Sequence, residues 1–123
     1  MRTVKKILVV GDRVLISPED PSGMTKSGLY LPPGVQEKEK IQGGYVVKIG
    51  PGYPIPNPDA IEEPWAPRRE PIRYLPLQVE EGDYALFLRS QGVELEFEGT
   101  QYLVVPQAAI LVLVRQELVE DAD

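Results

Sequence analysis

The chain has 123 residues, no cysteine, no histidine and a formal net charge of −6 at pH 7. The missing residue types exclude disulfides, thiolate metal sites and the side chain that most often serves as a metal ligand or general base. The acidic balance argues against a nucleic-acid partner, which needs a basic surface, and the length predicts one domain over residues 1–123.

The first apolar run comprises residues 7–10 and follows a basic start, MRTVKK. This run is shorter than the roughly 7–15 apolar residues of a secretory signal, and no run approaches the roughly 18 residues that span a bilayer. We therefore expect no signal peptide and no membrane partner. Together with the absence of cysteine, this favours a cytoplasmic location.

The stretch TKSGLYLPPGVQEKEKIQGG, residues 25–44, is polar and rich in helix and strand breakers except for one apolar triplet. Nothing in the flanks carries the three side chains easily into a core, so the pattern predicts an exposed binding element on a loop. The alternative is that the triplet packs on the surface of its own domain. The triplet and its flanking residues are Gly28, Leu29, Tyr30, Leu31 and Pro32.

Elsewhere the helix period is almost absent, and the runs that stand out are short and rich in β-branched and aromatic residues. Glycine, proline, aspartate or serine separates these runs. Many short strands with turn signals between them predict an all-β fold, either a barrel or a sandwich. The expected strands cover residues 7–10, 13–16, 45–49, 84–88, 93–97, 102–105 and 110–114.

Residues 51–76 hold eight of the thirteen prolines of the chain. Proline cannot donate to a β-ladder and fixes φ, so this segment is predicted to be neither a central strand nor a helix. Its length and its apolar residues, Trp65 among them, indicate a functional segment that packs on something, such as another copy of the chain. A weak PxxP pattern at residues 64–67 is also compatible with a ligand of an SH3-type module.

The stretch GVELEFEGTQYLVV is typical of a β-hairpin with its turn at residues 98–100. Apolar and acidic residues alternate along its first strand, which predicts one core face and one solvated carboxylate face. A metal or acid–base site made from the glutamates is the alternative, but a solvated face is the simpler interpretation. The alternating residues are Val93, Leu95 and Phe97 on one face and Glu94, Glu96 and Glu98 on the other.

Two further runs, one near each end of the chain, are apolar at every position. A strand that is apolar on both faces is covered on both faces, and an open edge of such strands aggregates unless it is paired. Two explanations stay open, namely pairing between neighbouring subunits and a buried closing pair within one barrel. The residues concerned are Ile7, Leu8, Val9 and Val10 at the start and Ile110, Leu111, Val112, Leu113 and Val114 near the end.

The sequence contains no catalytic constellation. The serines lack a histidine, GGYVVKIGPG lacks the spacing of a dinucleotide-binding fingerprint, and no carboxylate pair lies in a cleft-forming context. We therefore predict no catalytic residues and no metal site, which favours a binding or assembly protein over an enzyme.

Five segments, taken in order, resemble the GroES-type co-chaperonins, the small lids of the 60-kDa chaperonin. GDRVLISPED is similar to the opening strand and turn of that family, and TKSGLYLPPG resembles its mobile-loop signature. QGGYVVKIGPG, VEEGDYALF and YLVVPQAAILVLV are similar to its later strands. The segments cover roughly residues 10–50 and 79–114, and their shared order makes the match fairly specific.

The resemblance implies a small irregular GroES-like β-barrel with a mobile loop at about residues 22–44, a proline-rich roof-like insertion at about 51–76 and an acidic tail at 115–123. It also implies a homo-oligomeric ring, usually a heptamer, in which the first strand of one subunit pairs with the last strand of its neighbour. Such a ring caps a 60-kDa chaperonin and closes an ATP-driven folding chamber. Because the chaperonin binds the ATP, we expect no cofactor and no enzymatic activity in this chain.

The family also implies functions for particular residues. Gly28, Leu29, Tyr30, Leu31 and Pro32 are expected to bind the chaperonin, with both leucines in an apolar groove and the tyrosine at its edge. The two terminal apolar runs are expected to form the subunit interface. An aliphatic residue is more usual in place of the tyrosine, which leaves the preference for a partner open. The expanded insertion is expected to supply roof or extra contacts through Trp65, Arg68 and Arg69.

Two other functions are alternatives to this one. An oligomeric GroES-like β-barrel adaptor, or a structural ring protein with a different client, fits the same fold. A fragment of a medium-chain alcohol dehydrogenase is disfavoured, because that enzyme needs cysteine and histidine zinc ligands and a dinucleotide-binding domain.

Overall fold

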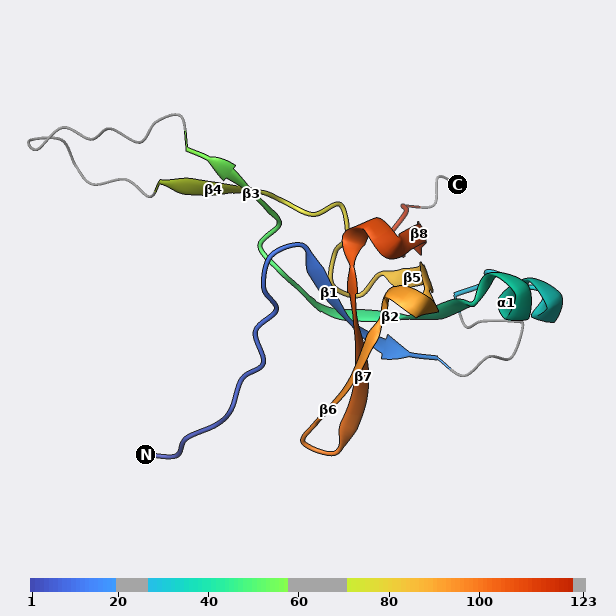
Figure 1. The fold of residues 1–123 in the computed structure, drawn as a ribbon, viewed down its shortest axis with the longest axis horizontal. Helices are drawn as coiled ribbons and strands as arrows, with labels where there is room; N and C mark the ends of the chain where they lie inside the picture. Colours follow the sequence, from blue (N-terminus) through green and yellow to red (C-terminus); the bar gives the residue numbers. More distant parts are fainter. Residues whose placement is uncertain (20–26, 58–70, 121–123) are drawn as a thin grey trace, which may run out of the picture.

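A computed structural model describes residues 1–19, 27–57 and 71–120 of the chain (Figure 1). Its main body is one antiparallel sheet with the order β6-β7-β1-β2-β5-β8. The strands of this sheet are β1 (Arg13–Pro18), β2 (Ile41–Ile49), β5 (Tyr84–Leu88), β6 (Val93–Phe97), β7 (Thr100–Pro106) and β8 (Ile110–Val114). A separate two-stranded sheet contains β3 (Tyr53–Pro56) and β4 (Ile72–Leu75). The helical segments are α1 (Pro33–Glu39) and the 3₁₀ turns η1 (Arg89–Gln91) and η2 (Gln107–Ala109). The predicted all-β class is confirmed.

The core is centred on β1, which pairs with β2 on one side and with β7 on the other. Val14, Leu15 and Ile16 of this strand are at most 1% exposed. Burying a side chain of this kind contributes about 1.5–3 kcal/mol relative to leaving it in water, so the central strand holds much of the stabilising apolar area. The core cluster consists of Val14, Ile16, Val46, Leu77, Val79, Ala85, Phe87, Leu103, Val105 and Ala109.

The predicted β6–β7 hairpin is present and its glutamates are exposed, as predicted, but the apolar residues of β6 do not form the predicted core face. Residues directly opposite each other on paired strands share a face, and Glu94 lies opposite Leu103, a member of the core cluster. Leu95 lies opposite Tyr102 on the other face, and both are only half-buried, while Val93 is 65% exposed. The glutamates therefore lie on the side of the core and the apolar residues on the outer side.

This inversion has a simple physical reason. β6 is an edge strand of the sheet, and the β6–β7 hairpin extends away from the main body (Figure 1). Because β6 extends beyond the core, even the face that it shares with the core residues of β7 is in contact with water and can carry carboxylates. Alternation fixes which residues share a face, but it does not fix which face points inward.

The proline-rich region contains the β3–β4 hairpin, which projects away from the six-stranded sheet (Figure 1). Pro54 and Pro56 are tolerated in β3 because a strand of a two-stranded sheet pairs on one side only, so not every backbone N–H has to donate to the β-ladder. Its apolar side chains remain largely in solvent, since Ile72, Tyr74 and Leu75 are 47%, 47% and 55% exposed. Trp65, Arg68 and Arg69 lie outside the described residues, so their predicted contacts stay predictions.

Two local features differ from the predicted elements. Residues 7–10, expected to form a strand, have no regular structure in the single chain, with Leu8 and Val10 exposed. A short helix, α1, follows the apolar triplet where a loop was expected. The sequence feature that favours this helix is Pro33 at its first position, because the fixed φ of proline suits the start of a helix. Within the described ranges, no helix has the length and apolar character that crossing a bilayer requires.

The β3–β4 hairpin predicts that residues 58–70 are dispensable for folding of the six-stranded sheet. The backbone N–H of Asn57 donates to the carbonyl of Pro71 over 2.9 Å, so an Asn-Gly turn can join the two strands in place of residues 58–70. We expect the free energy of unfolding, measured in urea, to change by less than about 2 kcal/mol. Loss of the cooperative transition would instead show that this segment belongs to the core.

Candidate functional site

The loop that carries the apolar triplet connects two neighbouring antiparallel strands, β1 and β2. At its base Pro18 lies opposite Gly44, and the backbone N–H of Glu19 donates to the carbonyl of Gly43 over 2.9 Å. A Cβ atom on Gly44 would lie 2.5 Å from the carbonyl oxygen of Ser17, so only glycine allows the two strands to approach this closely. The loop is therefore anchored at both ends by the ladder.

Within the loop, exposure alternates along the triplet. Leu29 and Leu31 are half-buried, whereas Tyr30 is 57% exposed. Such alternation is the pattern of an extended segment, in which neighbouring side chains point to opposite sides. In the single chain the two leucines therefore lie toward the protein and the tyrosine toward solvent. Gly28, which precedes the triplet, has a φ of 90° that a side chain would disfavour.

Helix α1 returns the chain from the triplet to β2. It starts after Pro32 and is capped by Lys40, which follows its last residue and has the left-handed φ of 53° typical of a helix end. The carbonyl of Lys40 accepts a hydrogen bond of 2.8 Å from the backbone N–H of Arg89. This bond ties the end of the loop to the turn that follows β5.

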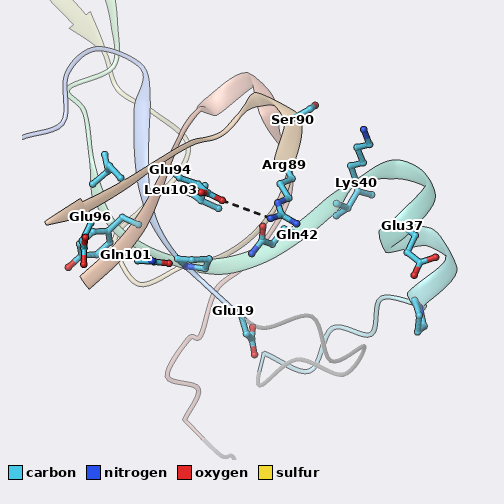
Figure 2. Close-up of a pocket in the computed structure, with 15 residues that line it drawn as sticks. Glu19, Glu37, Lys40, Gln42, Arg89, Ser90, Glu94, Glu96, Gln101 and Leu103 are labelled. Carbon is cyan, nitrogen blue, oxygen red and sulfur yellow. Dashed lines mark ion pairs between the residues drawn. The ribbon is translucent and has the colours of Figure 1, made fainter. Parts of the chain in front are cut away.

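An open pocket of 1240 Å³ lies beside the loop, between its two ends and the β6–β7 hairpin (Figure 2). Its charged residues are of both signs, and the guanidinium of Arg89 lies 3.9 Å from the carboxylate of Glu94. No group of His, Cys, Asp or Glu with the spacing of a metal site occurs in the described part of the chain. The charged residues around the pocket are Glu19, Glu37, Lys40, Arg89, Glu94 and Glu96.

The two apolar runs predicted to form an interface are not brought together within the single chain. β8 ends the sheet, and among the described residues its only strand neighbour is β5. Leu111 and Val112 on this edge are 50% and 44% exposed. The N-terminal run exposes Leu8 and Val10, at 72% and 77%. A single copy therefore presents one unpaired apolar edge and one unpaired apolar segment.

Comparison with known proteins supplies a family assignment. The family described as Chaperonin 10 Kd subunit matches residues 6–64. The co-chaperonin GroES of Rhodothermus marinus is 36% identical over 112 residues, which cover 91% of this chain and 95% of that protein. The co-chaperonin GroES of Coprothermobacter proteolyticus is 33% identical over 112 residues, covering 91% and 98%.

The chain belongs to the GroES-type co-chaperonin family. A co-chaperonin GroES of Listeria welshimeri, 34% identical over 106 residues, supports the same assignment and covers 86% of this chain and 96% of that protein.

In this co-chaperonin, an ion pair that the sequence did not predict supports the exposed β8 edge. The guanidinium of Arg115 donates to both carboxylate oxygens of Asp83, each over 2.7 Å, and the Asp83 side chain is only 2% exposed. The hydrogen bonds from Arg115 are the main cause that holds the pKa of Asp83 below its ordinary value, against the opposing effect of burial. The pair joins the end of β8 to the turn before β5.

A glutamine supports the base of the β3–β4 hairpin. The side-chain oxygen of Gln107 accepts hydrogen bonds from the backbone N–H groups of Gln78 and Val79, over 2.7 and 3.1 Å. Its amide group donates to the hydroxyl of Tyr53 over 3.3 Å, and its backbone N–H donates to the carbonyl of Asp12 over 3.0 Å. One residue thus joins the hairpin, the segment after it and the start of β1.

The ion pair makes a prediction for stability against pH. Because the pKa of Asp83 is lowered in the folded state, its contribution is complete above about pH 4, the pKa of an unfolded aspartate, and is lost as the pH falls further. Arg115→Met should lower the unfolding temperature at pH 7 and flatten its dependence below pH 4. The combined Asp83→Asn, Arg115→Met variant is the control, because it leaves no buried carboxylate unpaired. Identical pH profiles for Arg115→Met and the wild type would contradict this role.

Proposed function

We propose that this chain forms a ring that caps a 60-kDa chaperonin and attaches through the apolar triplet of each copy. One observation carries the proposal. In a chain of the GroES-type family, the Leu29–Tyr30–Leu31 triplet stands on a loop whose ends are fixed between β1 and β2. The six-stranded sheet can thus hold its shape while the loop changes conformation. The ATPase belongs to the partner, and this chain acts by binding alone.

Binding through such a loop is weak for one copy and strong for a ring. A segment that becomes ordered on binding loses conformational entropy, which reduces the affinity of each loop. Linked copies bind with an avidity that can exceed a single affinity by about 10²–10⁴. Weak individual contacts therefore permit firm capture and prompt release when the chaperonin changes state.

The half-burial of the two leucines adds a step to this mechanism. Leu29 and Leu31 lie toward the chain's own surface, and Tyr30 lies outward. Docking of the leucines in an apolar groove requires the loop to turn them away from that surface. The loop can do so without disturbing the sheet, because its fixed points lie at Pro18 and in β2.

Ring formation accounts for the apolar ends of the chain. The exposed edge of β8 and the exposed run at residues 7–10 both have strand-forming sequences without a strand partner in the described chain. Pairing of the run of one copy with the β8 edge of the next satisfies both. A heptamer is the ring size that we propose from the family. An oligomeric adaptor with another client is the alternative that the binding experiment below separates.

The triplet is tested by Leu29→Ser combined with Leu31→Ser. Burying a leucine contributes about 2 kcal/mol, so each loop loses roughly twice that and the effect multiplies across the ring. Capture by the chaperonin of the same organism in the presence of ATP, followed by native mass spectrometry, should be abolished. Val35→Ser is the control, since it removes an apolar side chain from α1 of the same loop and should leave capture intact.

The mass of the ring without chaperonin must be unchanged in both variants, which shows that the substitutions act on capture and not on assembly. Survival of capture in the double variant would refute the anchor assignment. Failure of the wild type itself to bind the chaperonin would favour the adaptor.

A further inference from the structure

The N-terminal end of this acidic chain is basic. Arg2, Lys5 and Lys6 are exposed and precede the apolar run at residues 7–10. None of the three has an ion-pair partner among the described residues. Figure 1 shows this end of the chain on the opposite side of the molecule from β8. A partner for these charges must therefore be sought outside the copy that carries them.

An excess of negative charge lies at the end of β8. Arg115 follows this strand, and its guanidinium lies 2.7 Å from a carboxylate oxygen of Asp83 and 3.1 Å from one of Glu80. Glu117 also lies close enough to act on the pKa of Arg115 electrostatically, and Glu120 follows in the exposed tail. One guanidinium cannot neutralise several carboxylates. Asp83 is buried and already bonded to Arg115, so we call the exposed carboxylates Glu80, Glu117 and Glu120 the acidic shoulder of β8.

The two charged groups fix the direction in which the segments can pair. If residues 7–10 of one copy run antiparallel to β8 of the next, residues 2–6 continue past the end of β8 and reach the acidic shoulder. In the parallel direction they would lie beside residues 106–109, PQAA, which carry no charge. Opposite charges placed together favour the antiparallel arrangement and disfavour the alternative.

We propose that Arg2, Lys5 and Lys6 of one copy lie across the acidic shoulder of its neighbour and fix the register of the subunit interface by charge. This inference rests on the proposed ring and adds an electrostatic contact beyond the apolar strands. A uniformly apolar strand specifies its register poorly, because each shift by two residues presents a similar face. Charges at one end remove that ambiguity. The contact lies at the surface, so it is screened by salt.

Reciprocal charge reversal tests the contact. Lys5→Glu combined with Lys6→Glu should raise the concentration at which the oligomer dissociates by about tenfold at low salt, and Glu117→Lys combined with Glu120→Lys should do the same. Joining all four substitutions restores both the net charge and the complementarity, so assembly should return to near the wild-type level. Analytical ultracentrifugation at low and high ionic strength measures each variant, and the differences should shrink at high salt.

Glu96→Lys combined with Glu98→Lys is the matched control for the reversal at Glu117 and Glu120, because it changes the net charge by the same amount and in the same direction on the β6–β7 hairpin. It should leave assembly unchanged. If the wild type is an oligomer but the reversals have no effect, or if the fourfold variant is not rescued, the charge contact is refuted while the ring stands. If the wild type stays monomeric at every ionic strength and concentration, the proposed ring and this inference both fall.

Discussion

The antiparallel ladder between β1 and β2 is the constraint on which the rest of the structure depends. It buries β1 and contributes Val14, Ile16 and Val46 to the core cluster. It also holds the two ends of the triplet loop next to each other, because Pro18 pairs with Gly44. Gly44 makes this ladder possible, because a side chain there would meet the backbone of β1. The loop can be long and polar without loosening the sheet, since its ends are held by backbone hydrogen bonds. The supporting strands and the candidate binding segment thus belong to one hairpin.

Much of the fold was predictable because strand formation here follows local composition. Six of the seven expected strands are present in the six-stranded sheet, with modest changes at their ends. The orientation of β6 was not predictable. Its alternating residues define two faces, but only the register with Leu103 reveals which face lies toward the core. The run at residues 7–10 has strand-like composition yet no partner in one chain, so composition alone could not place it.

The polar contacts that position the candidate sites had no recognisable sequence signal. Arg115 reaches Asp83 across 32 positions in the chain, and Gln107 reaches Tyr53 across 54. Long-range pairs of this kind depend on the tertiary fold, which a pattern of neighbouring residues does not encode. The triplet was easier to identify, because an apolar group flanked by glycine and proline stands out within a polar segment. Its half-buried leucines, however, depend on how the loop folds back, and only the structure shows them.

The unpaired edge of β8 has a consequence for the kind of assembly that the chain can form. In the proposed pairing, the donor segment and the acceptor edge are different parts of each copy, so the contact is head-to-tail. Such a contact propagates until it closes into a ring, or continues as an open filament if the rotation between copies does not close. Every open filament keeps one exposed edge and one unpaired segment, whereas a closed ring keeps neither. The angle between neighbours therefore decides between a soluble particle and a fibre.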